Sequence, residues 1–126
     1  MGYRSQVVLA ISKHLTPFLT LAASQNADAQ ALVFKYNDNF DRDYGGDKSW
    51  LLVWDSIKWY ESYDDIQTIE SFVQKACSDE YEFEVDGEAQ SSCEHIRFVR
   101  VGEESGDIEM MGDGFWDIYA NTSICY

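Results

Sequence analysis

The stretch of the chain most suggestive of a chemical role is a regular alternation of acidic and apolar side chains. Carboxylates occupy every even position from Glu80 to Glu88, and Tyr81, Phe83 and Val85 stand between the first four of them. Such alternation is typical of a half-buried strand, whose successive side chains point to opposite faces. We therefore predict an outward acidic row with a repeat of about 6.6–6.8 Å along one strand. The row consists of Glu80, Glu82, Glu84, Asp86 and Glu88.

A second group of acids lies in residues 37–47, which we predict to form a long loop. This segment is rich in asparagine, aspartate and glycine, which are common in turns. Asp41, Asp43 and Asp47 do not match the twelve-residue calcium loop, because the required glycine and the terminal glutamate fail in every register. A less regular cation site stays open as an alternative. We expect these three aspartates to add charge to the surface formed by the acidic row.

Three cysteines and one histidine offer donors that zinc prefers. Cys93 and His95 are two residues apart, and Cys77 and Cys125 complete a set of four. Their spacing matches no compact zinc site, and Cys77 falls on the apolar face of a predicted helix. We therefore expect buried or idle thiols, no metal site and no cofactor.

Catalysis is not indicated by the sequence. Neither of the two histidines, His14 and His95, has a neighbouring nucleophile and orienting acid that the sequence reveals. The chain also contains no glycine-rich phosphate-binding loop. We predict a non-enzymatic protein. The alternative is a small enzyme whose pocket uses Trp50, Trp54 and Trp59 together with nearby acids.

Charge narrows the choice of partners. The 126 residues include 23 acids against 9 lysines and arginines, which gives a net charge of −14, and all the acids lie from Asp28 onward. Such a field repels nucleic acid and anionic membranes and attracts basic protein surfaces. A solvated face that only keeps the protein soluble is the alternative. The odd number of cysteines and the shortness of the apolar run at residues 7–11 favour a protein of the cytoplasm.

Hydrophobic periodicity predicts the elements that carry these residues. Strands are predicted at residues 6–12, 31–36, 50–54, 80–88 and 96–101, a hairpin at 108–119, and helices at 15–26 and 62–77. Strand 96–101 is expected to return beside the acidic strand, with Arg97 projecting towards its carboxylates. We predict a single domain, residues 1–126, of the α+β class. Two helices pack on one face of a mainly antiparallel sheet, most simply in a ferredoxin-like arrangement.

Three segments, in order, resemble a family of small phage and prophage proteins. They are Met1–Ser5 followed by a hydrophobic strand, Trp54–Tyr60 followed by Tyr63–Ile66, and Phe98–Glu104 leading into Asp107–Glu109. The resemblance implies a phage origin and one compact α+β domain. It supplies no catalytic residues, and it does not extend to the acidic row.

The resemblance and the charge together suggest an inhibitor of host machinery. Small, acidic, non-enzymatic phage proteins are often anti-CRISPR or anti-restriction proteins that occupy DNA-binding clefts, in some cases as DNA mimics. We therefore expect this protein to bind the basic surface of a host nucleic-acid enzyme or defence complex in the host cytoplasm, without direct contact to nucleic acid or membrane. A homodimeric interaction subunit is a further alternative.

Overall fold

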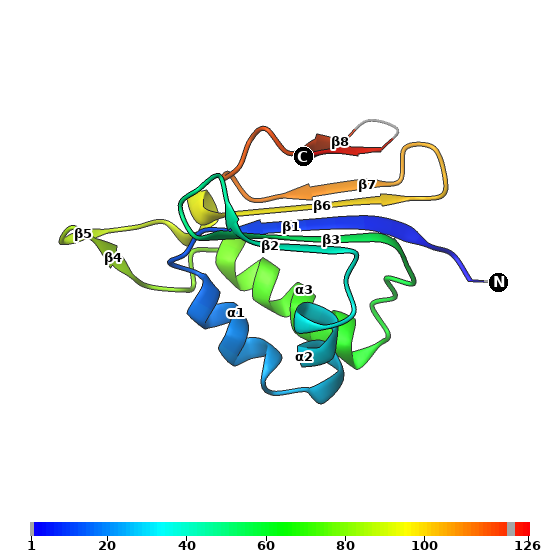
Figure 1. Ribbon diagram of the computed structural model, residues 1–126, viewed down its shortest axis with the longest axis horizontal. Helices are drawn as coiled ribbons and strands as arrows, with labels where there is room; N and C mark the ends of the chain where they lie inside the picture. Colours follow the sequence, from blue (N-terminus) through cyan, green and yellow to red (C-terminus); the bar gives the residue numbers. More distant parts are fainter. Residues whose placement is uncertain (1, 121–122) are drawn as a thin grey trace.

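The computed structural model describes residues 2–120 and 123–126. Its centre is a five-stranded antiparallel sheet with the strand order β2-β3-β1-β6-β7 (Figure 1). The strands of this sheet are β1 (Ser5–Ile11), β2 (Asn39–Tyr44), β3 (Ser49–Ile57), β6 (Ile96–Gly102) and β7 (Ile108–Met111). The predicted α+β class with a mainly antiparallel sheet is thus confirmed.

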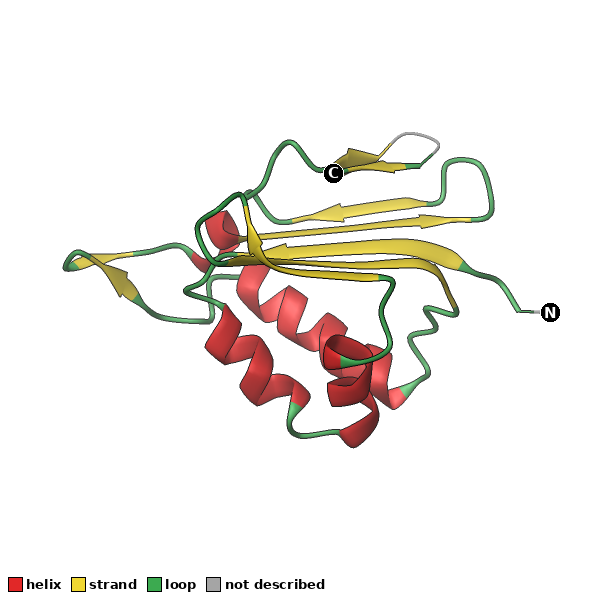
Figure 2. Ribbon diagram, in the orientation of Figure 1, coloured by secondary structure: helices red, strands yellow, loops and turns green. Residues whose placement is uncertain are grey.

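Helices cover one face of the sheet (Figure 2). In the described part of the chain they are α1 (Thr16–Ala23), α2 (Ala27–Phe34) and α3 (Asp64–Cys77), together with the short 3-10 helix η1 (Ser92–His95). The prediction of two helices was therefore wrong, since the described residues form three α-helices. None of the helices among the described residues is long and apolar enough to cross a bilayer.

Strand β1 lies in the middle of the sheet and is covered on both faces, as its apolar sequence predicted. Val7, Leu9 and Ile11 face the helices, whereas Val8 and Ala10 face the opposite side. All five side chains are fully buried. A strand without a polar face fits only where both faces are covered, so β1 fixes the two-sided architecture.

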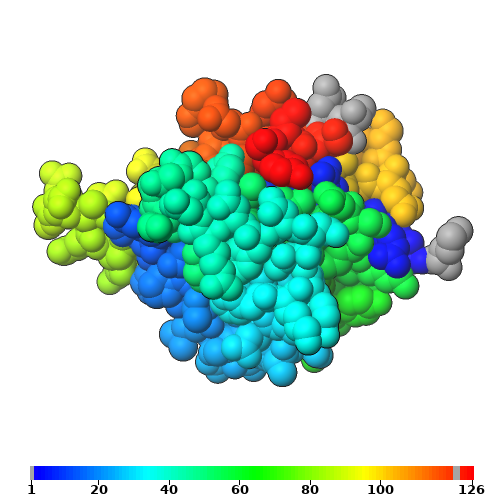
Figure 3. Space-filling model, viewed as in Figure 1, coloured from blue at the N-terminus to red at the C-terminus, as the bar shows by residue number. Residues whose placement is uncertain are grey.

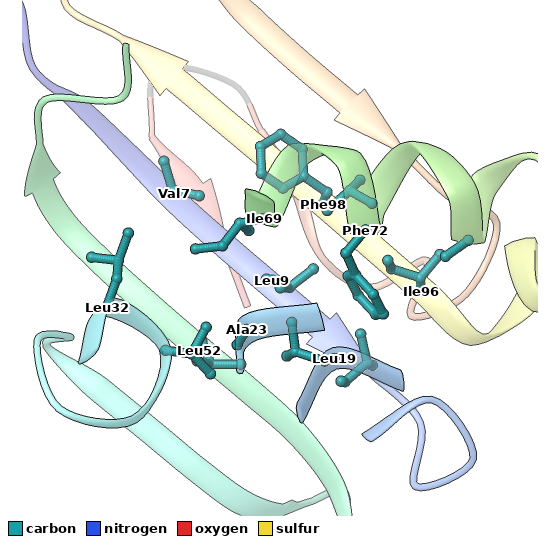
Figure 4. Packing of buried hydrophobic residues seen from close by; sticks show 14 of the residues in the cluster. Val7, Leu9, Leu19, Ala23, Leu32, Leu52, Ile69, Phe72, Ile96 and Phe98 are labelled. Atoms are coloured by element: carbon teal, nitrogen blue, oxygen red, sulfur yellow. The ribbon is translucent and has the colours of Figure 1, made fainter. Parts of the chain in front are cut away.

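The larger core lies between the sheet and the helices. Leu19 of α1, Ile69 and Phe72 of α3, and Leu9 and Phe98 of the sheet belong to one cluster (Figure 4). The apolar residues of α3 recur every three or four positions and are buried on that side of the helix, as predicted.

A thinner layer covers the other face of the sheet. It is built from residues 112–118 and the small hairpin of β8 (Tyr119–Ala120) and β9 (Ile124–Cys125). Ile118 and Ile124 pack against Val8 and Val99 there. The predicted pairing across Gly112 was wrong, because β7 pairs with β6 and β8 pairs with β9.

Residues 31–36 were predicted as a strand but belong largely to α2. The side chain of Asn26 accepts a hydrogen bond from the Ala29 amide and so caps the start of this helix. Ala29, Leu32 and Val33 are buried at helical spacing. The capped start therefore prevails over the β propensity of the apolar residues near its end.

The predicted loop at 37–47 contains an edge strand. Asn39, Phe40 and Asp41 pair with Val53, Leu52 and Leu51 of β3. The turn that follows contains Gly45 and Gly46, both with positive φ. The acidic composition of β2 suits its position at the edge of the sheet, because charged side chains on an outer strand discourage pairing with other chains.

The strand predicted at residues 80–88 is absent. Helix α3 ends in a Schellman motif in which the amides of Asp79 and Glu80 donate to the carbonyls of Ala76 and Lys75. The chain then forms a small hairpin of β4 (Glu84–Val85) and β5 (Glu88–Ala89). Asp86 and Gly87 both have positive φ and make its turn.

Candidate functional site

The candidate site is one end of the main sheet, where four connecting segments meet. These are the β2–β3 turn, the β4–β5 hairpin, η1 and the segment 112–118, and their colours lie at the same side of the molecule in Figure 1 and Figure 3. A shallow hollow of about 300 Å³ lies between the β2–β3 turn, η1, Phe115 and the chain that follows β1. Its lining residues are Ser12, Lys13, His14, Asp47, Ser49, Glu94, His95 and Phe115.

We call this region the acidic end. Its carboxylates come from segments that are distant in the sequence, and most are exposed. They are Asp41, Asp43, Asp47, Glu80, Glu82, Glu84, Asp86, Glu88, Glu94, Asp113 and Asp117. The two groups of acids predicted from the sequence are therefore carried by adjoining segments of the fold.

The three predicted aspartates of the β2–β3 hairpin stabilise its turn. The Asp41 carboxylate accepts from the Asp43 amide at 2.9 Å, and the Asp43 carboxylate accepts from the Lys48 amide at 2.9 Å. Asp47 accepts from the Ser49 amide at 3.1 Å. The hydrogen bond from the Ser49 side chain lowers the pKa of Asp47, with a smaller contribution from the Ser49 amide. Hydrogen bonds from the backbone therefore hold all three carboxylates in place.

The predicted row of five carboxylates does not lie on one face. Glu80 belongs to the cap of α3, and Glu82 follows it in irregular chain. In the hairpin, Glu88 lies opposite Val85 and Glu84 lies opposite Ala89. Residues opposite each other point to the same face, so Glu84 and Glu88 point to different faces. The five groups are all exposed, but they surround a projecting hairpin rather than form a ladder.

Aromatic side chains fix the base of this hairpin to the domain. The Phe83 ring stacks on the His14 ring with centroids 5.5 Å apart and meets the His95 ring edge-on at 4.9 Å. Tyr81 packs against Phe18 and Phe72 of the helices. The alternation in the sequence therefore did identify the half-buried residues, although the strand prediction was wrong.

Ser12 and His95 form a hydrogen-bonded pair that the sequence did not reveal. Ser12 Oγ lies 2.8 Å from His95 Nδ1, and His95 Nε2 lies 3.3 Å from Gln90 Oε1. The geometry suits a neutral imidazole that accepts from Ser12 and donates to Gln90. A catalytic serine–histidine pair needs a carboxylate to stabilise the imidazolium, and here the third group is an amide. The arrangement favours a structural role that joins β1, η1 and the hairpin.

The His95 pair predicts a loss of stability in mild acid. Burial lowers the pKa of His95 below its usual value of 6.5, and nearby His14 lowers it further. The unfolded chain then binds more protons below pH 6.5, so the free energy of unfolding should fall as the pH drops from 7.5 to 5.5. Urea titrations should show this decrease, and it should be smaller in His95→Gln. An equal decrease in both proteins would assign it to other groups.

Three carboxylates of the acidic end were not predicted from the sequence. They are Glu94, Asp113 and Asp117. Glu94 lines the hollow beside Asp47. Burial raises the pKa of Tyr44, and the charges of Asp117 and Asp41 raise it further, which places both carboxylates near this phenol. Their only signal in the sequence is the acidic composition around Gly112, and no local pattern brings them to Asp41.

Ion pairing lies away from the acidic end. Among the described residues, both ion pairs use Arg100, which contacts Asp107 at 2.7 Å and Glu109 at 2.8 Å. The prediction that Arg97 projects towards the carboxylates of residues 80–88 was wrong. The Arg97 guanidinium donates to the carbonyls of Gly112 and Ile118 at 2.9 Å each. No ion pair within the described chain involves a carboxylate of the acidic end.

The tryptophans considered for an enzyme pocket pack against other side chains of the main core. Trp54 and Trp59 are buried in the main core with ring centroids 5.7 Å apart. Trp59 Nε1 donates to Glu70 at 2.8 Å. Burial raises the pKa of Glu70, and the hydrogen bond from Trp59 opposes this increase. Trp50 lies apart, against Phe40.

The candidate zinc donors are not gathered into a metal site. Cys77 and Cys93 lie near each other at the end of α3, and burial raises the pKa of Cys77 to about 12. Burial also raises the pKa of Cys93, with Asp113 adding to the effect. Both thiols are therefore protonated near neutral pH and are poor nucleophiles. In residues 2–120 and 123–126, no three histidine, cysteine or acidic side chains are arranged to hold a metal ion.

Comparisons with protein-family models, with curated proteins and with solved structures gave no match. Its function must therefore be inferred from the charge and geometry described above.

Proposed function

We propose that this protein is a phage-encoded, non-enzymatic inhibitor that occupies the basic surface of a host nucleic-acid-handling or defence protein. One observation carries the proposal: residues 41–47, 80–88, 94 and 113–117 bring eleven carboxylates to one end of the sheet, and both ion pairs of the described chain lie elsewhere. The phage origin rests on the resemblance of the three sequence segments. The host cytoplasm, where such targets work, is the proposed location.

Electrostatics explains why such a surface would find a basic partner. The eleven carboxylates outnumber the cations of the same end, which are Lys13, Arg42 and Lys48. They therefore produce a local negative potential, which speeds the approach of a positively charged surface. The hydrogen bonds within the β2–β3 turn and the aromatic base of the hairpin hold these charges on ordered backbone. Less ordering entropy is then lost when the partner binds.

The spacing of the charges supports occupation of a basic cleft more than imitation of a duplex. Duplex DNA carries one charge per about 1.7 Å of its axis, whereas alternate residues of a strand are about 6.6–6.8 Å apart. Glu84 and Glu88 also point to different faces of their hairpin. We therefore propose that the carboxylates contact the basic surface as an irregular cluster and not as a row with the spacing of DNA phosphates.

We also infer a ferredoxin-like core. The order of elements β1, α1, β2, β3, α3, β6, with neighbouring strands β2-β3-β1-β6, supports this assignment. Helix α2 and the outer strand β7 are then additions to that core. The fold hosts many unrelated functions and carries no activity by itself.

The proposal predicts that charge reversal at the hairpin weakens binding. Glu82→Lys with Glu84→Lys should lower affinity for the host target about tenfold and flatten its salt dependence, because each exposed charge contributes about 0.2–1 kcal/mol. Both side chains are exposed, so the melting temperature should change little. The target would be captured from host lysate at low salt, identified by mass spectrometry and titrated with each purified protein.

A matched control changes the same net charge elsewhere. Glu61→Lys with Glu104→Lys replaces two exposed acids outside the acidic end and should retain most of the affinity. Cells expressing the wild-type protein should also admit an otherwise restricted phage, and cells expressing the hairpin variant should admit it less well. Equal binding by both variants and the wild type would rule out the acidic end as the contact surface.

A further inference from the structure

Trp116 is unusually exposed for a tryptophan. The residue is 79% accessible, the highest value among the large apolar residues of the described chain. Trp54 and Trp59 are buried in the core, so exposure is not a general property of the aromatic residues in this protein. An indole in water has an energetic cost, and exposed aromatic residues are enriched at binding sites.

The backbone holds Trp116 outward. Phe115, the preceding residue, has φ of +51°, which is rare for a bulky side chain. Phe115 and Ile118 pack into the thinner layer on the face of the sheet opposite the helices. The Gly114 amide donates to the Ile96 carbonyl at 3.1 Å, and the Ile118 amide donates to the Phe115 carbonyl at 2.9 Å. The segment is thus fixed on both sides of an indole that contributes little to the core.

Two exposed aspartates lie on the same short segment as Trp116. Asp117 follows Trp116 in the chain, and its charge acts on Tyr44, whose ring packs against Phe115. Asp113 is held at the start of the same segment, where its amide donates to the Cys93 carbonyl at 2.8 Å. An exposed indole on a segment that carries two exposed carboxylates is complementary to a cation that is planar and weakly hydrated.

Arginine fits this description better than lysine. A guanidinium stacks flat on an aromatic ring and also donates two parallel hydrogen bonds to a carboxylate. Within the described chain an arginine already lies over aromatic rings, because the Arg42 guanidinium is 4.7 Å from the centroid of the Phe40 ring and 6.0 Å from that of the Trp50 ring. There the cation belongs to the same chain, whereas at Trp116 it would come from outside.

We propose that Trp116 is an anchor that stacks on an arginine side chain of a basic protein partner, with the neighbouring aspartates binding the same guanidinium. This inference rests on the proposed function and specifies which residue of the partner is recognised. Electrostatic attraction brings the basic surface to the acidic end, and the indole then selects arginine over lysine.

The test uses two peptides of equal charge, nona-arginine and nona-lysine, titrated calorimetrically into the full-length protein. Trp116→Ala should weaken nona-arginine binding about two- to fivefold and change nona-lysine binding less. Trp116→Tyr should retain part of the arginine preference. Tyr36→Ala is the matched control, because Tyr36 is 62% exposed but lies at the end of α2 beside Lys35. This control should bind both peptides as the wild type does.

The outcomes separate the two proposals. If the wild type binds neither peptide, the electrostatic function fails whatever the role of Trp116. If both peptides bind but Trp116→Ala changes them equally or not at all, the arginine anchor is overturned and the acidic surface stands. Sedimentation at micromolar concentration completes the test, since a dimer that becomes monomeric in Trp116→Ala would assign the indole to self-association and also overturn the anchor.

Discussion

Replacing Gly112 by alanine is expected to lower the free energy of unfolding by about 2 kcal/mol or more. Gly112 has φ of +92°, where an L side chain is strained. An added Cβ would also overlap the backbone carbonyl of Ile96, which cannot move without disturbing β6. Strain and overlap act at the same residue, so both contribute to the loss.

A second glycine separates these two causes. Gly106 has φ of +82°, but an added Cβ would meet nothing within 4 Å. Gly106→Ala should therefore cost only the backbone strain, about 1–2 kcal/mol. Urea denaturation of the two variants gives the comparison, and equal losses would show that the overlap is relieved without cost. In Gly112→Ala the displaced segment should also alter the fluorescence of Trp116.

The parts of the fold that the sequence predicted correctly are those with a strong local pattern. Strand β1 has five consecutive apolar residues, and only a strand covered on both faces accommodates them in so short a segment. Helix α3 buries Ile66, Ile69, Phe72, Val73 and Ala76 on one side, which is the periodicity that its sequence displays. In both cases burial and local pattern agree, so the prediction did not depend on distant residues.

The predictions that were wrong concern segments in which two local signals compete. In residues 80–88 the alternation indicated one strand, but Asp86-Gly87 is the dipeptide of a tight hairpin turn and reverses the chain. In residues 26–34 the helix cap at Asn26 prevailed over the β-branched and aromatic residues near the end. In both segments the turn or cap residues determine the local structure, and the β propensity of the neighbouring residues does not.

The candidate site was predictable only in part. Asp41, Asp43 and Asp47 were identified by composition, yet their proximity to Glu94 and Asp117 depends on how the sheet orders its strands. Trp116 also has no distinguishing pattern in the sequence. Its exposure follows from the packing of Phe115 and Ile118 on a core layer that no local periodicity indicated.

Replacing Phe72 by alanine should cost still more, about 3–5 kcal/mol of the free energy of unfolding. Phe72 is 1% exposed and packs between α3 and the sheet (Figure 4). Its ring also packs against Tyr81 at the base of the β4–β5 hairpin. The cavity removes contacts from the sheet and from Tyr81, so the β4–β5 hairpin should also become easier to cleave by protease. Leu21→Ala is the control, because Leu21 is 65% exposed and its loss should change stability by less than about 0.5 kcal/mol. A loss at Phe72 no larger than this would mean that the helices contribute little to holding the sheet.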